Sequence, residues 1–223
     1  MEATLAVVVV AGMIGVAVLA IFFNADARIK RAIRKAPRTD IADFPQHGAA
    51  KIVGTIRMLD DSLRAPLSGR VCTYYEATVE EYRRRGKHSS WVNIIIETDG
   101  TPFLIEDSTG RALVDPRGAR VALVVDGTSK SGTFDDATPQ EEEFLQRHNR
   151  KSQGWFLNKS LRYREGVLEI GETVTVFGAG IREADPDAVN DAGGYRGMAP
   201  TRIRLGGSSK SALMISDDPS VQG

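Results

Sequence analysis

The chain has 223 residues, 42% of them hydrophobic, which is enough to bury one sizeable core and predicts one domain with appendages. Its 29 basic and 29 acidic side chains cancel, so it lacks the global positive field that draws proteins onto nucleic acid, and we expect no nucleic-acid partner. The single cysteine, Cys72, excludes an internal disulfide framework and a cysteine-rich zinc site within one chain.

The first element is an uncharged stretch over residues 4–23, TLAVVVVAGMIGVAVLAIFF. At about 1.5 Å per residue, a helix of this length matches the hydrocarbon core of a bilayer. We therefore predict a transmembrane anchor over residues 1–24 that crosses the membrane once. A cleaved signal peptide is the alternative, because small residues follow the stretch, but Glu2 stands where a signal peptide carries a basic residue and the apolar run is too long. Ala11 and Gly15, four residues apart, would let two such helices pack closely as a homo-oligomer.

Residues 25–47 are predicted to be a basic juxtamembrane linker. Their positive charge places the C-terminal side of the span in the cytoplasm, so we expect the N-terminus outside and the soluble domain inside, at the plasma membrane if the protein is bacterial. The basic residues are also candidates for contact with anionic lipid headgroups, although they serve equally well as a topology signal alone. These candidates are Arg28, Lys30, Arg31, Arg34 and Lys35.

From residue 48 the pattern changes to two-residue alternation, which predicts strands. Asp99-Gly100 between two apolar runs is a strong hairpin signal, and further turns are predicted at Glu165-Gly166 and Gly171-Glu172. Residues 185–199 are rich in Gly and Asp and predict an exposed loop. The segments with strand patterns are 50–59, 69–82, 91–107, 111–116, 161–183, 201–207 and 211–216.

One helix interrupts the strands after residue 137. Thr138 is suited to the N-cap, Pro139 to the first helical position, and Glu141 to the capping-box position. Phe144 and Leu145 give this helix an apolar face for packing on a sheet. The predicted fold class is therefore mainly β: an N-terminal transmembrane helix followed by a small antiparallel β barrel or sandwich with one amphipathic helix, over residues 48–218, and then a disordered tail over residues 219–223.

Catalytic chemistry is not indicated. The three histidines do not stand at metal-ligand spacing, and Cys72 lies in a strand at a position typical of a core residue. Asp107 to Gly110 has the composition of a tight hairpin turn, which explains it better than a catalytic loop does. We therefore expect no catalytic residue, no cofactor and no metal.

Two features are candidates for partner binding. Residues 80–91, EEYRRRGKHSSW, form a basic turn that can contact an acidic partner, phosphate or lipid, or can simply be a solvated hairpin tip. The aromatic residues nearby can equally belong to the core. The candidate partner-binding residues are Tyr74, Tyr75, Arg83, Arg84, Arg85 and Trp91.

Three segments carry a family resemblance: PLSGRVCTYYEATVEEY (66–82), PFLIEDSTGRALVDPRGA (102–119) and RYREGVLEIGETVTVFGAG (162–180). Together with the terminal LMISDDP they resemble the GIDE domain, also called the beside-a-membrane or BAM domain, and the resemblance covers roughly residues 48–218. This domain is found in membrane-anchored ubiquitin ligases of mitochondria and chloroplasts and in prokaryotic membrane proteins. The resemblance implies a role in partner or substrate recognition, whereas ubiquitin transfer in those ligases depends on a separate RING finger and their domain lies between two spans.

A RING finger needs several cysteines with histidine to bind two zinc ions, and this sequence has only Cys72. It also has no second apolar stretch long enough to span a membrane after Phe23. We therefore expect a membrane-anchored, non-catalytic recognition or scaffold module that binds a protein or peptide. The alternatives are a ubiquitin-ligase-like component that uses a RING supplied in trans, and a sensor of anionic lipid or membrane stress.

Overall fold

The computed structural model describes residues 25–86, 88–131, 136–151, 160–186, 200–206 and 212–223. The predicted anchor lies outside these residues, as does the loop beyond residue 186. Within the described residues, no helix has the length and apolarity needed to cross a membrane.

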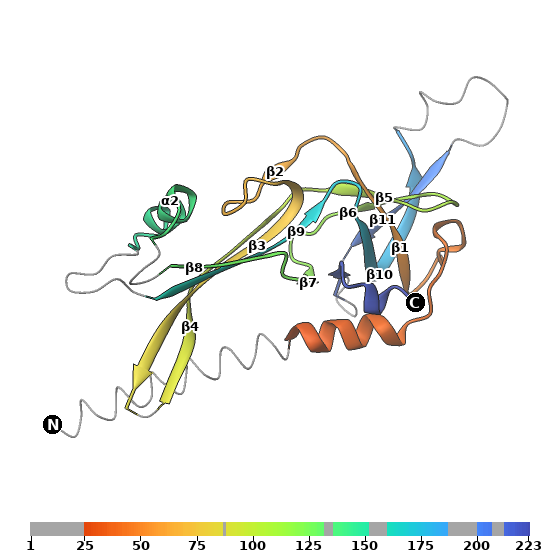
Figure 1. The fold of residues 1–223 in the computed structure, drawn as a ribbon. Coiled ribbons are helices and arrows are strands. Elements are labelled where there is room, and N and C mark those ends of the chain that lie inside the picture. The colour runs from red at the N-terminus through yellow and green to blue at the C-terminus, as the bar shows by residue number, and fades with distance from the viewer. Residues whose placement is uncertain (1–24, 87, 132–135, 152–159, 187–199, 207–211) are drawn as a thin grey trace.

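Strands make up most of the described chain, which confirms the prediction of a mainly β fold (Figure 1). Besides the strands there are a helix over residues 25–35, a helix α2 (Pro139–Arg147) and two short 3-10 helices, η1 (Ile41–Asp43) and η3 (Pro219–Val221). The strands are β1 (Ala49–Met58), β2 (Leu63–Arg64), β3 (Val71–Arg85), β4 (His88–Gly100), β5 (Phe103–Glu106), β6 (Arg111–Val114), β7 (Arg120–Ala122), β8 (Gly127–Ser131), β9 (Leu161–Glu169), β10 (Thr173–Ala184), β11 (Thr201–Gly206) and β12 (Met214–Ser216).

The first sheet closes on itself as a small barrel. Its strands follow the order β1-β5-β6-β11-β10, and β10 pairs again with β1, while β12 and β7 extend the sheet from β10. Alternate residues such as Ile52 and Ile56 of β1 point inward and are fully buried, together with Phe103 of β5 and Val176 of β10. Closure leaves the ring of five strands without an open edge.

The barrel is not purely antiparallel, so that part of the prediction is wrong. β6 pairs with β11, and β7 with β12, in parallel. Parallel neighbours need a long connection between them, and here the chain between β6 and β11 passes through the second sheet. Local alternation specifies which residues form strands, but it does not specify which distant strand lies alongside.

The second sheet contains β4, β3, β9 and β8 in that order, and β2 pairs with the start of β3. Helix α2 covers one face of it, where Phe144 and Leu145 pack with Val79 and Tyr163 (Figure 1). β9 runs without interruption through Glu165-Gly166, so no turn occurs there. Gly166 is needed instead for close packing, because a Cβ at this position would lie 2.8 Å from the carbonyl oxygen of Val124.

The predicted capping box of α2 is present. The Thr138 hydroxyl accepts a hydrogen bond from the Glu141 N–H, and the Glu141 carboxylate accepts one from the Thr138 N–H at 2.8 Å. We expect Thr138→Ala to lower the free energy of unfolding by about 1 kcal/mol, because one N–H at the helix start then loses its partner. Urea denaturation followed by circular dichroism measures this, and Thr138→Ser, which keeps the hydroxyl, is the control. Equal losses for both variants would contradict the capping role.

The segment predicted as a linker contains the helix over residues 25–35, which packs against the first sheet. Ile29 and Ile33, four residues apart, are buried with Ala122 and Val221. The tail predicted as disordered is ordered for a related reason: it forms η3, and Val221 is fully buried there. The fully buried amine of Lys51 donates to the carbonyl oxygens of Val221 and Gly223.

Candidate functional site

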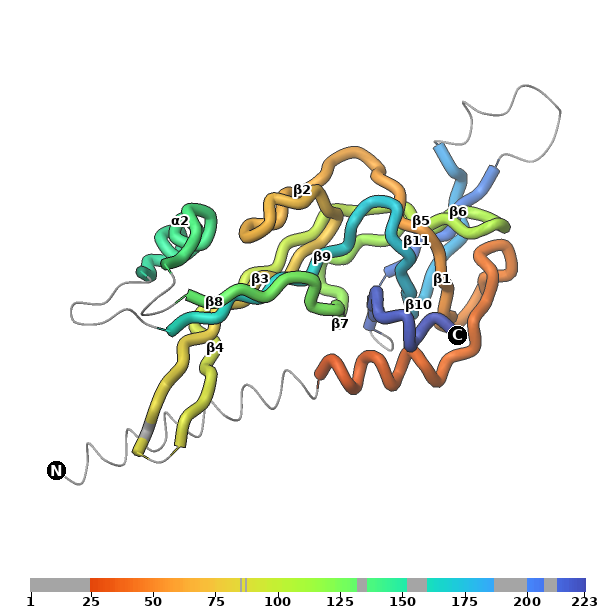
Figure 2. Tube along the Cα trace, viewed as in Figure 1, coloured from red at the N-terminus to blue at the C-terminus, as the bar shows by residue number. Residues whose placement is uncertain are grey.

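The end of the β3–β4 hairpin projects from the second sheet (Figures 1 and 2). The two strands remain paired as far as Arg85 and His88. Tyr82 and Trp91 stand opposite each other in this pairing, with ring centroids 5.3 Å apart, and Tyr82 is 43% exposed. Two large aromatic side chains therefore lie at an accessible end of the domain.

Arg162 of β9 joins this aromatic pair. Its guanidinium lies 4.5 Å from the centre of the Trp91 ring, within the range of a cation–π interaction. The same guanidinium donates to the carboxylate of Glu80 at 2.5 Å, and Glu80 is only 2% exposed. Arg162 thus neutralises a buried carboxylate and at the same time holds the Trp91 ring in place.

Strand alternation puts Arg84 on the same face as Tyr82, and Arg84 is exposed. Arg83 points to the opposite face, where it pairs with Glu81 at 2.8 Å. We call the surface formed by Tyr82, Arg84, Trp91 and Arg162 the hairpin patch.

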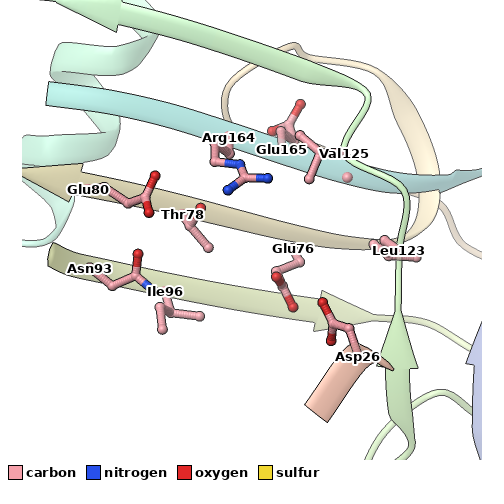
Figure 3. A pocket seen from close by; sticks show the side chains of 11 residues that line it. Asp26, Glu76, Thr78, Glu80, Asn93, Ile96, Leu123, Val125, Arg164 and Glu165 are labelled. Atoms are coloured by element: carbon pink, nitrogen blue, oxygen red, sulfur yellow. The ribbon is translucent and has the colours of Figure 1, made fainter. Parts of the chain in front are cut away.

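A cleft lies on the same face of the sheet as the hairpin patch. Figure 3 shows the side chains that line it. The cleft holds a cavity of about 80 Å³, between the sheet, the first turn of the helix over residues 25–35, and the segment 123–125. Its lining residues are Asp26, Glu76, Thr78, Glu80, Asn93, Ile96, Leu123, Val125, Arg164, Glu165 and Gly166.

Two carboxylates face each other across this cleft. Figure 3 shows Asp26, from the helix, opposite Glu76, from β3, with Arg164 of β9 above them. Burial raises the pKa of Asp26, while the positive charges of Lys30 and Arg164 oppose that rise. Burial also raises the pKa of Glu76, and the nearby charge of Asp26 raises it further. The charged groups that line the cleft are therefore predominantly acidic, beside the apolar side chains of Ile96, Leu123 and Val125.

The LMISDDP segment contacts the segment 123–125 that lines the cleft. Asp217, which is 5% exposed, accepts a hydrogen bond from the N–H of Val124 at 2.8 Å and so fixes the segment that lines the cleft. Burial raises the pKa of Asp217 to about 7. Asp218 pairs with Lys30 at 2.8 Å, and this contact lowers the pKa of Asp218 to about 2. Asp217 thus fixes the segment 123–125, and Asp218 fixes the helix over residues 25–35.

The predicted partner-binding residues divide into two groups. Tyr74 packs in the barrel core and is 9% exposed, and Tyr75 packs in the second core and is 7% exposed. Neither tyrosine is available to a partner in this structure. Arg84 and Trp91 lie in the hairpin patch, and Arg83 lies beside it. The structure does not describe the side chain of Arg85.

The sequence analysis missed Tyr82 and Arg162. Tyr82 lies next to the arginine run, and the hairpin register that places it opposite Trp91 was a usable signal. Arg162 comes from a distant strand, and local sequence gave no indication of its position over Trp91.

The predicted lipid-facing residues also divide. Lys30 pairs with Asp218, and Arg34 donates to the Ser220 hydroxyl at 2.8 Å, so both bind the helix to the domain. Arg28, Arg31 and Lys35 are exposed and occupy the outer face of the helix.

The described residues contain no cluster of His, Cys, Asp and Glu suited to a metal ion. Cys72 is fully buried, and burial raises the pKa of its thiol to about 11, so it lacks the thiolate character of a nucleophile. Asp107 makes the hairpin turn predicted between β5 and β6: it accepts hydrogen bonds from the N–H groups of Thr109 and Gly110. Its second oxygen accepts from the N–H of Ile41 at 2.9 Å, which connects η1 to the barrel.

A comparison with curated proteins and one with solved structures found no match. The model of the GIDE family, described as E3 ubiquitin ligase, matches residues 74–188, slightly more than half of the chain. The matched region starts in β3 and includes the hairpin patch, α2, β9 and β10. On this match, which agrees with the resemblance of the three segments, the chain belongs to the GIDE family.

Proposed function

We propose that the chain is a membrane-anchored, non-catalytic recognition module that binds a protein or peptide partner beside the membrane through the hairpin patch. The anchor is the apolar segment 4–23, with the N-terminus outside and the domain in the cytoplasm. The observation that carries the proposal is the patch itself. Trp, Tyr and Arg dominate the energetics of protein interfaces, and here one residue of each type lies in direct contact.

The fixed positions of the side chains in the hairpin patch support this role. Trp91 is held between Tyr82 and Arg162, and Arg162 is fixed by Glu80. Side chains fixed before binding lose little conformational entropy when a partner docks. The patch is therefore organised for contact without rearrangement of its own residues.

The test is photo-crosslinking of the full chain in its own membranes. A benzoylphenylalanine at position 82 keeps an aromatic ring in the patch, and one at Ile181 of β10, 55% exposed, is the control for an accessible apolar position elsewhere. We expect a reproducible protein adduct from position 82 only, lost in Arg84→Glu and kept in Arg64→Glu, an exposed arginine on β2. No adduct, or the same adduct from both positions, would refute the proposal.

A second candidate rests on the description of the family. As a ligase-like component, the chain would present substrates to a RING finger supplied in trans, and its adduct would contain a RING protein. The lipid-sensor alternative rests on Arg28, Arg31 and Lys35, and predicts lipid adducts in place of protein.

A further inference from the structure

Strand β4 forms a long sheet edge that carries no lysine, arginine or proline. It has 13 residues and pairs on one side with β3, and within the described chain its other side has no partner strand. Natural proteins protect exposed edges with lysine, proline or short strands. β4 contains neither Lys, Arg nor Pro, and its centre is Val92, Asn93, Ile94, Ile95 and Ile96.

Other edges among the described strands are short. β8, at the opposite side of the same sheet, has five residues including Lys130, and β7 has three. The five-stranded ring has no edge because β1 pairs with β10. β4 therefore differs from these edges both in length and in composition.

The charges at the two ends of β4 are opposite in sign. His88 begins the strand beside the arginines at the end of β3, and Asp99 lies near its other end. Glu97, also near that end, already pairs with Arg147 of α2 at 2.7 Å, so the charge available to a second strand there is that of Asp99. His88 and Asp99 pair with Arg85 and Tyr75 of β3, both odd-numbered positions, so they belong to the same face of the sheet. If a second β4 lies antiparallel, the basic end of each strand meets the acidic end of the other.

A β-bulge divides β4 into equal halves. Val79 pairs with Ile95 and Glu80 with Asn93, so Ile94 is the extra residue between segments 88–93 and 95–100. A two-fold axis at Asn93 would place His88 opposite the partner's Asp99 and Ser89 opposite the partner's Thr98, so that opposed residues share a face of the sheet. The bulges, where the strand bends, would then lie next to the axis.

We propose that two copies of the chain associate through antiparallel pairing of their β4 edges about a two-fold axis at Asn93. Such an axis is normal to the sheet, so the cleft face of both copies lies on one side of the combined sheet. Asp26, at the start of the helix, lies on that face (Figure 3). Two anchors can then enter one membrane, a step that rests on the anchoring in the proposed function. Edge pairing leaves the hairpin patch accessible in both copies.

Tethering makes a small interface sufficient. Pairing of a single strand edge buries less surface than a stable soluble dimer needs. Two anchored chains diffuse in one membrane, however, and their raised effective concentration favours association without further contacts. We therefore expect the dimer in membranes, with weaker association in dilute detergent.

The test is cysteine crosslinking of the full chain in its membranes with a short bismaleimide. Because its single cysteine, Cys72, is fully buried, the native chain is expected not to crosslink and measures the background. Asn93→Cys lies at the axis and is expected to form dimers with itself. Thr98→Cys lies roughly 27 Å from its copy in this arrangement and is expected not to. Thr128→Cys, exposed on β8, is the control for chance encounters. Ser89→Cys mixed with Thr98→Cys is expected to form the crossed pair.

The opposite charges provide a second test. His88→Glu and Asp99→Lys are each expected to lower the Asn93→Cys dimer yield about five-fold, because like charges then meet across the strands, and the double variant is expected to restore it. Equal crosslinking at Asn93, Thr98 and Thr128, absence of crosslinking at Asn93, or capture of a different protein at Asn93 would overturn the proposal. The result is independent of the adduct at position 82, so failure of either proposal is recognised separately.

Discussion

Arg162→Ala is expected to lower the free energy of unfolding by about 3 kcal/mol and to release Trp91. The buried Glu80 carboxylate would lose its counter-charge, and an unpaired buried charge costs several kcal/mol. The Trp91 ring would also lose the guanidinium 4.5 Å from its centre. Chemical denaturation followed by circular dichroism measures the first effect, and the loss of the adduct from position 82 measures the second.

The double variant Arg162→Ala/Glu80→Gln separates these effects. It removes the buried charge together with its partner, so most of the lost stability should return, while the adduct should stay weak because Trp91 still lacks its support. If Arg162→Ala alone changes the unfolding free energy by less than about 1 kcal/mol, the ion pair does not have the role assigned to it.

The pH dependence of stability is expected to carry a signature of Asp217. Its pKa is about 7 in the folded state and about 3.9 in an unfolded chain, so between these values the folded state holds a proton that the unfolded state has released. The contribution of Asp217 to the free energy of unfolding therefore falls by between about 2 and about 4 kcal/mol as the pH rises from about 4 to about 7. Above that pH it levels off.

Asp217→Asn isolates that contribution. The amide oxygen can still accept from the Val124 N–H but does not titrate. We expect the unfolding free energy of the native chain minus that of this variant, measured from pH 4 to pH 8, to show the same decrease between about pH 4 and about pH 7. Parallel curves would show that Asp217 does not keep a raised pKa. Asp26 and Glu76 also have raised pKa values, but they are present in both proteins and cancel in the difference.

The sequence predicted the structure correctly where the signal lies within one short segment of the chain. Alternation located most of the strands but not β2, β7 or β8, and Thr138 with Glu141 located the start of α2. The spacing of Ile29 and Ile33 was also a local helix signal, but the charges around them concealed it. Closure of the barrel through β1 and β10 and the parallel pairs were not predictable, because they depend on contacts between distant strands.

The candidate site was only partly predictable for the same reason. Tyr74 and Tyr75 are adjacent and therefore point to opposite faces of β3, and the sequence left open whether they belong to the core or bind a partner. Both are buried because β3 begins between the barrel core and the second core. Conversely, the arginine run and Trp91 were visible in the sequence, but the support from Arg162 and Glu80 required the fold.

The position of β3 between the two cores has a mechanical consequence. Its neighbours Tyr74 and Tyr75 belong to different cores, and so do Leu168 and Val167 on the paired strand β9. A strand pair clamped at both of its faces resists bending, so the two sheets should move as one lever without a hinge. A force or a bound partner at the hairpin end would then reorient the barrel and the helix over residues 25–35 together.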